Sequence, residues 1–216
     1  MNVGTLVKQT DSHLFYRVES PPIHVLEKLN YKSVDVLIKD NRVRSAKQNA
    51  KVHAIFGEIA KWSGYDAEIE IKPMFKHWFM AVRELEYFSM SDVDMTTCKE
   101  FIEFLIEFCL ENDVPTMFPL LDKDVDVYKW VYWCAVYKRC CVCQKSGKGI
   151  VHLHHHKRIG IGRNRKEIVH ENYPIQTLCS THHRESHNGQ ESFDDKYKLV
   201  PVLVDKTILK VYKLKH

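Results

Sequence analysis

Several features that sort proteins into classes are missing from this chain of 216 residues. No apolar run is long enough to span a membrane, and the first residues contain no secretory apolar stretch. The cysteine count is seven, an odd number, which is not expected of a disulfide framework. The chain also has no internal repeat and no low-complexity tract. These absences argue against a membrane, secreted or repeat protein and predict a protein of a reducing cytoplasm.

The composition that is present is ordinary, but its charge is uneven. The chain is 44% hydrophobic and 28% charged, and it is long enough for two small domains. Residues 139–216 hold 15 Lys and Arg against 7 Asp and Glu, a net charge of +8. The residues before them hold 17 against 21, a net charge of −4. A basic half of this kind favours a polyanionic partner, although a solvated basic face would explain the charge alone.

Hydrophobic periodicity predicts a mainly helical first part with a small antiparallel sheet. Two short apolar runs around a polar turn are typical of a hairpin over residues 5–18, and an alternating strand follows over 33–38. Helices are expected over 46–64, within 68–88, over 98–111 and over 125–138. Capping-box spacings mark two helix starts, at Ser45 and at Thr97. The end of the chain is expected to form a short helix over 192–198 and one or two strands over 199–215.

Potential metal ligands are concentrated between residues 139 and 187. Eight of the 13 histidines lie there, at positions 152, 154, 155, 156, 170, 182, 183 and 187. Four of the seven cysteines join them, at positions 140, 141, 143 and 179. This concentration predicts bound metal, with two ligand sets separable by spacing. The alternative is a module with a single zinc ion, in which the other histidines are merely exposed and polar.

The first ligand set is typical of a structural zinc site. Cys140 and Cys143 have the spacing of a tight turn in which both sulfurs face one tetrahedral Zn²⁺. Cys179 and His182 form a second such pair and would complete a Cys₃His site.

The second ligand set is typical of a catalytic cation. His183 and His187 are four residues apart, so on a helix their imidazoles lie on one face, one turn apart. With His154 from an upstream strand they form a three-ligand site with open positions, which structural sites lack. His155 would point to the opposite face of that strand and could act as a general base near neutral pH.

These residues resemble the zinc-bracketed HNH endonucleases. The resemblance rests on Cys140…Cys143, Leu153-His154-His155, Asn172 and Leu178-Cys179-x-x-His182-His183-x-x-x-His187. It implies a ββα-metal module, in which a β-hairpin and a helix hold one divalent cation, Mg²⁺, Mn²⁺ or Zn²⁺. His154, His183 and His187 would ligate this cation and His155 would be the base. Asn172 would fix the loop that carries the base through backbone hydrogen bonds.

Three features depart from the HNH pattern. His156 makes the register of the base ambiguous by one position, and the second zinc pair ends in His182 where cysteine is usual. The third feature is a basic, glycine-rich stretch over residues 157–166. Its glycines would allow close backbone approach to phosphates, and Arg163, Arg165 and Lys166 would donate to DNA. A stretch of this kind is similar to the phage subgroup of HNH nucleases.

A second resemblance covers residues 30–135. Val36–Ile38, Arg44-Ser45-x-x-Gln48-Asn49 and Met95-Thr96-Thr97-x-x-Glu100-Phe101 are similar to the phage NinB/Orf recombination proteins. Those proteins dimerise, bind DNA with a preference for single strands, and help to load recombinase onto strands coated by single-strand-binding protein. The resemblance implies a homodimer, a possible contact with the host single-strand-binding protein, and a DNA-binding surface at Arg42, Arg44 and Lys47. Cations at a helix start favour a nearby anion, although a solvated basic turn explains them equally.

The sequence therefore predicts an α+β protein with two domains. Residues 1–138 would form the mainly helical DNA-binding domain with a small antiparallel sheet, and residues 139–216 the ββα-metal HNH module with a structural zinc knuckle. The expected function is metal-dependent hydrolysis of DNA phosphodiester bonds in phage recombination or replication, on single-stranded or branched DNA in the host cytoplasm. The alternative is a non-catalytic mediator that binds single-stranded DNA and carries a structural zinc finger.

Overall fold

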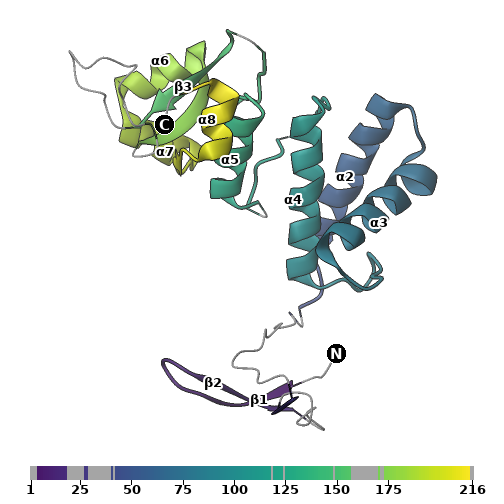
Figure 1. Cartoon of the computed structure of the whole chain (residues 1–216). Helices are drawn as coiled ribbons and strands as arrows, with labels where there is room; N and C mark the ends of the chain where they lie inside the picture. Colours follow the sequence, from purple (N-terminus) through teal and green to yellow (C-terminus); the bar gives the residue numbers. More distant parts are fainter. Residues whose placement is uncertain are drawn as a thin grey trace. The chain divides into compact units, whose positions relative to one another are not determined.

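A computed structural model describes residues 4–18, 27–28, 40, 42–117, 119–123, 125–147, 149–156, 170 and 173–214. Contacts divide the chain into two units, Met1–Lys39 and Asp40–His216, which are described separately (Figure 1). This division does not test the boundary expected between residues 138 and 139, which stays a prediction. The fold is α+β, as predicted, with helices and two small antiparallel sheets. Among the described residues, no helix is both long and apolar enough to cross a bilayer.

The first unit contains a hairpin. Strands β1 (Gly4–Gln9) and β2 (Leu14–Val18) pair antiparallel, and the Thr10 amide donates to the His13 carbonyl across the turn at 2.9 Å. The hairpin predicted over residues 5–18 is therefore confirmed. The strand predicted over 33–38 lies outside the described residues.

The second unit begins with a helix whose two ends follow from local chemistry. Helix α2 runs over Ala46–Ser63, and the Ser45 hydroxyl accepts from the Gln48 amide while the Gln48 side chain accepts from the Ser45 amide. Gly64 ends the helix at a φ of 81°, a left-handed conformation that glycine adopts without a Cβ penalty. Both predicted ends are confirmed.

Three further helical segments complete this part of the chain. A π-helical turn, η1 (Ala67–Ile71), leads directly into α3 (Lys72–Arg83), which has Pro73 in its first turn. Helix α4 runs over Met95–Glu111, so the start predicted near Cys98 is wrong by three residues. The reason is that Asp94, rather than Thr97, is the N-cap: its carboxylate accepts from the Thr97 amide at 2.8 Å.

Aromatic side chains fill the space between these helices. Helices α2 and α3 both contact α4, and they lie beside it in Figure 1. The ring centroid of Phe79 in α3 lies 5.0 Å from that of Phe101 in α4, and the ring centroid of Phe56 in α2 lies 5.9 Å from that of Phe101. All three are fully buried. This part of the chain is therefore held together by apolar burial.

The rest of the unit is a small sheet with helices around it. Helix α5 (Val127–Val136) precedes a sheet in the order β3-β4-β5, formed by Val151–His155, Pro174–Cys179 and Val202–Leu203. Three more helices follow or separate these strands: α6 (Ser180–Asn188), α7 (Gln190–Tyr197) and α8 (Lys206–Tyr212). Helices α5 and α6 contact β4, and α8 contacts α5 (Figure 1).

The tail differs from the sequence-based expectation. Among the described residues of this segment only Val202 and Leu203 form a strand, and Lys206–Tyr212 form α8 where strands were expected. Asp205 accounts for the change, because its carboxylate caps the helix by accepting from the Ile208 amide at 2.9 Å. Ile208 and Leu209 then turn toward the core and are buried.

Candidate active site

Strands β3 and β4 and helix α6 bring the predicted metal ligands together. The strands pair antiparallel with His154 opposite Gln176 and Val151 opposite Cys179. Strand β4 runs straight into α6, because Cys179 is both the last residue of the strand and the N-cap of the helix. Helix α6 also contacts β3 and β4, so donors from these strands and from the first two turns of α6 come close together.

Four of these donors form one group, here called the Cys₃His cluster: Cys140, Cys143, Cys179 and His182. Their ligand atoms all lie within 4.8 Å of one another. The Sγ atoms of Cys143 and Cys179 are 3.8 Å apart, and His182 Nδ1 lies 3.2 Å from the sulfur of Cys179. Two thiolates on a tetrahedral Zn²⁺ with bonds of about 2.3 Å are separated by about 3.8 Å. The donor set therefore fits a tetrahedral ion without rearrangement.

The turn that carries the first two cysteines, residues 139–146, is here called the knuckle. The Cys140 amide donates to the Lys145 carbonyl at 2.9 Å and the Gln144 amide donates to the Cys140 carbonyl at 2.8 Å. The Cys141 backbone fastens the knuckle to its surroundings: its amide donates to the Thr177 carbonyl of β4, and its carbonyl accepts from Trp130 Nε1 of α5 at 2.8 Å. The cysteine pair is therefore anchored to both a strand and a helix.

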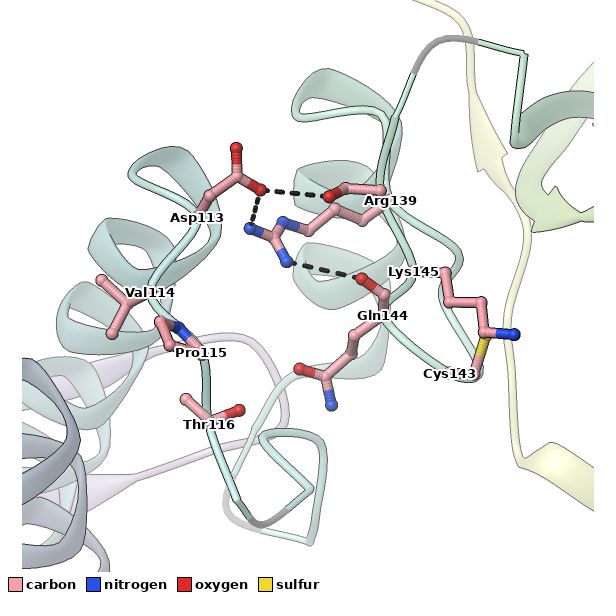
Figure 2. A pocket seen from close by; sticks show the side chains of 9 residues that line it. Asp113, Val114, Pro115, Thr116, Arg139, Cys143, Gln144 and Lys145 are labelled. Carbon is pink, nitrogen blue, oxygen red and sulfur yellow. Dashed lines mark hydrogen bonds and ion pairs between the residues drawn. The ribbon is translucent and has the colours of Figure 1, made fainter. Parts of the chain in front are cut away.

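Arg139 braces the knuckle against the end of α4. Its guanidinium donates to Asp113 at 2.5 Å and to the Gln144 carbonyl at 3.4 Å, as Figure 2 shows, and its Nε donates to the Leu110 carbonyl at 3.0 Å. Asp113, Arg139 and Gln144 border a pocket of about 480 Å³. Cys143 of the Cys₃His cluster also lines it, but His154, His183 and His187 do not. The pocket therefore lies beside the knuckle and outside the candidate catalytic site.

Burial and hydrogen bonding shift the pKa values of Cys140 and Cys179 in opposite directions. Burial raises the pKa of Cys140 to about 12. Burial also acts to raise the pKa of Cys179, but hydrogen bonds from the backbone and side chain of His182 outweigh it and lower that pKa to about 6. The Cys179 sulfur is therefore readily available as a thiolate, the form that ligates metal.

The second group, here called the histidine cluster, consists of His154 from β3 and His183 and His187 from α6. Their ligand nitrogens all lie within 4.8 Å of one another. The His154 ring is 5.0 Å from that of His183 and 5.2 Å from that of His187. His154 is buried, His183 is half-buried and His187 is exposed. The cluster offers three donors to a metal ion and opens toward solvent, as a site that admits substrate must.

Burial favours the neutral form of two of these imidazoles, those of His183 and His154. Burial lowers the pKa of His183 to about 4, with further lowering from the neighbouring His154, His187 and His152. Burial also lowers the pKa of His154. A neutral imidazole is the form that binds a metal ion, so the environment favours ligation over protonation.

A comparison with protein families identifies the chain. The family described as "Putative HNHc nuclease" matches residues 16–215. The chain belongs to this family. The match runs through the helical part as well as the donor-rich part, so the HNH nuclease assignment applies to the chain as a whole. No curated protein and no solved structure matches the chain.

Two histidines of this HNH nuclease chain lie beside the cluster without joining it. His155 projects from the other side of β3, and its Nε2 is 3.1 Å from Nδ1 of His170, a buried residue to which the sequence assigned no role. His156 Nε2 lies 2.7 Å from an Asp194 carboxylate oxygen. Asn172, the other predicted catalytic residue, lies outside the described residues.

The predicted DNA-binding residues fall into two groups. Arg163, Arg165 and Lys166 lie outside the described residues. Arg42 is paired with Asp40, to which its Nε and NH2 each donate at 2.9 Å, and these bonds hold the pKa of Asp40 well below its usual range. Arg44 donates to the Met90 carbonyl, and Lys47 is exposed. Asp40 thus places one carboxylate of the chain itself beside Arg42, and DNA binding by the three residues stays a prediction.

Three polar residues next to the histidine cluster were missed by sequence reasoning: Gln176, Gln190 and Asp194. They join His154 and His156 in one hydrogen-bonded network. Gln190 and Asp194 are four residues apart on α7, a spacing that puts both side chains on one helix face. That spacing is visible in the sequence, but their approach to β3 depends on how α7 packs.

Proposed function

We propose that this HNH nuclease is a metal-dependent endonuclease that hydrolyses DNA phosphodiester bonds. The observation that carries the proposal is the histidine cluster, with three ligand nitrogens within 4.8 Å of one another beside a separate Cys₃His cluster. An incomplete donor set that opens to solvent suits catalysis, whereas four mutually close donors suit structural zinc. In this proposal the pairing of β3 and β4 with α6 is the ββα-metal arrangement of the HNH enzymes.

The residues around the cluster have distinct roles in the proposed hydrolysis. A divalent cation, Mg²⁺, Mn²⁺ or Zn²⁺, would supply Lewis-acid stabilisation of the phosphate and of the leaving 3′-oxygen when bound to His154, His183 and His187. His155 removes a proton from the attacking water. Its contact with His170 at 3.1 Å orients the imidazole. Asn172 fixes the loop that carries the base.

Structural zinc has a separate role in the proposal. Zn²⁺ on Cys140, Cys143, Cys179 and His182 would hold the knuckle to the junction of β4 and α6. Because His182 and His183 are neighbours in the chain, order imposed on one cluster is transmitted to the other. The cation ligands on α6 are thereby fixed before substrate binds.

The substrate setting follows from charge and resemblance. The basic residues Arg163, Arg165 and Lys166 would donate to DNA phosphates. The similarity to NinB/Orf proteins favours single-stranded or branched DNA formed in phage recombination or replication. A boundary near residue 138, a homodimer, a contact with single-strand-binding protein and DNA contacts by Arg42, Arg44 and Lys47 remain predictions of that similarity.

A nicking assay tests the proposal directly. Native protein with Mg²⁺ or Mn²⁺ is expected to cut single-stranded, duplex or branched DNA. The His155→Ala variant is expected to lose cleavage by about 10²-fold or more, while its metal content, fold and DNA affinity stay near native. The reason is that the base acts on water in the chemical step alone.

A second variant resolves the register of the base. If His156→Ala abolishes cleavage and His155→Ala does not, the base lies one residue later. If the native protein cuts none of these substrates with either cation, yet binds single strands tightly, the endonuclease proposal fails. A non-catalytic recombination mediator would then describe the protein better.

A further inference from the structure

Asp194 of α7 is the centre of a hydrogen-bond network beside the histidine cluster. Its two carboxylate oxygens accept from Gln190 Nε2 at 3.1 and 3.0 Å. Gln176 Nε2 donates to the same carboxylate at 2.6 Å, and His156 Nε2 lies 2.7 Å from it. The Asp194 side chain is only 15% exposed. A carboxylate with this many donors is held firmly in one position.

The orientation of the Gln190 amide follows from this arrangement. A carboxylate can only accept hydrogen bonds, so the Gln190 nitrogen must be the end that faces Asp194. The other end, Oε1, then faces His154 Nε2, at a distance of 2.6 Å. An alternative assignment with the amide reversed would direct an oxygen at the carboxylate and lose both bonds.

The tautomer of His154 follows in turn. The Gln190 oxygen is an acceptor only, so His154 Nε2 must carry the proton that is donated to it. In the neutral ring this leaves Nδ1 with the lone pair. We infer that Asp194, acting through Gln190, is a positioning residue that fixes His154 in the Nε2–H tautomer and so presents Nδ1 for metal ligation. This inference rests on the proposed cation site and adds α7 to it.

The surroundings of Gln176 support the same conclusion. Gln176 lies directly opposite His154 in the pairing of β3 and β4, and it is completely buried. Its side-chain oxygen is buried without a hydrogen-bond partner among the described residues, so the bond made by its nitrogen is the contact that offsets the cost of burying this amide. The Gln176 nitrogen donates to Asp194, so the Asp194 carboxylate accepts hydrogen bonds both from β4, the strand paired with that of His154, and from Gln190 of α7. The hydrogen-bonded series Asp194–Gln190–His154, here called the relay, is thus attached to the sheet as well as to α7.

The tautomer can be measured in the protein without added cation. In ¹⁵N-histidine NMR spectra of the full chain, the inference expects His154 to show a protonated Nε2 and an unprotonated Nδ1. In both Asp194→Asn and Gln190→Leu, this signal is expected to shift toward a mixture of tautomers. Asp195→Asn is the matched control, because it removes the same charge from an exposed neighbour on the same helix.

Cation affinity is the second readout, with Mn²⁺ as the probe. Residues that orient metal-ligating histidines typically contribute about 10- to 100-fold in affinity, so each relay variant is expected to bind Mn²⁺ more weakly by that factor. The double variant Asp194→Asn/Gln190→Leu is expected to bind Mn²⁺ as tightly as the single variant that has the lower Mn²⁺ affinity, because the two residues act as one unit. Asp195→Asn is expected to bind like the native protein.

The outcomes separate the relay from the nuclease proposal. A native His154 protonated at Nδ1, or native Mn²⁺ affinity in both relay variants, overturns the relay whether or not the protein cuts DNA. Loss of affinity in Asp194→Asn with none in Gln190→Leu also overturns it, because the effect would not pass through Gln190. Conversely, the expected tautomer and affinities in a protein that cuts no DNA would support the relay and contradict the nuclease.

Discussion

Helix α6 contributes to two donor clusters that differ in composition and in access to solvent. His182 belongs to the Cys₃His cluster and His183 to the histidine cluster, and neighbours on a helix point about 100° apart. The first cluster has four donors at spacings that suit a filled tetrahedron. The second has three donors and exposes His187. One helix therefore connects a group suited to holding structure with a group suited to chemistry.

The two parts of the second unit also differ in what stabilises them. Around α2, α3 and α4, packed aromatic rings such as Phe56, Phe79 and Phe101 supply the burial. Around the knuckle and α6, Cys140, Cys179 and His154 are buried among apolar residues such as Leu178, and α6 itself buries only Ser186. Metal ligation should consequently matter far more to the second region than to the first.

Removing a ligand of the Cys₃His cluster should have the largest effect. Cys143→Ser is expected to lose tightly held zinc and unfold the C-terminal third, because zinc binding can contribute on the order of 10 kcal/mol to folding a small module. Hydrogen exchange should rise across β4 and α6 while α2 and α4 stay protected. Native mass spectrometry should count one zinc fewer than in the native protein.

Cys141→Ala is the matched control for this prediction. Cys141 is buried and adjacent to Cys140 but belongs to neither cluster. Its loss should cost about 1 kcal/mol from removed packing and leave the zinc content unchanged. If native protein retains no zinc, or if Cys143→Ser retains it in full, the structural role of this cluster is wrong.

Removing a ligand of the histidine cluster should have a smaller and more local effect. His187→Ala is expected to keep the zinc and the fold but to weaken Mn²⁺ binding by about 10- to 100-fold, since one donor of three is lost. Calorimetric titration measures the change, and higher Mn²⁺ should partly restore cleavage. His152→Ala is the control, because His152 stacks 5.7 Å from His183 without belonging to the cluster. Equal losses in the two variants would contradict the assignment.

The contrast between the clusters was largely predictable, because it depends on local spacing. Donors three residues apart at a turn, and four residues apart on a helix, are brought together by backbone geometry alone. The same holds for α2, where Ser45, Gln48 and Gly64 determine both ends. Their partners across the fold needed only one further element, strand β3, which pairs with β4 in the register that brings His154 to α6.

What the sequence did not predict depends on tertiary packing or on competing caps. Asp94 starts α4 earlier than the apolar pattern indicated, and Asp205 starts a helix where strands were predicted, because a carboxylate can cap a helix before its first buried residue. Asp194 meets His156, and Asp40 meets Thr96, only once helices or loops are packed. Such polar partners follow no periodicity, and they orient the site residues that periodicity does predict.

The smallest expected effect concerns DNA binding and compares the basic residues of the two parts. Replacing Arg163 and Arg165 together by Gln should reduce the slope of log affinity against log salt by about two phosphate contacts, or about 1.8 units, since each contact releases counterions. Arg42→Gln should change the slope less, because the Asp40 carboxylate already neutralises that guanidinium through two bonds of 2.9 Å. Both slopes can be measured by fluorescence anisotropy on one labelled oligonucleotide. An unchanged slope in the double variant, with a reduced slope in Arg42→Gln, would move the DNA contacts from the glycine-rich stretch to the start of α2.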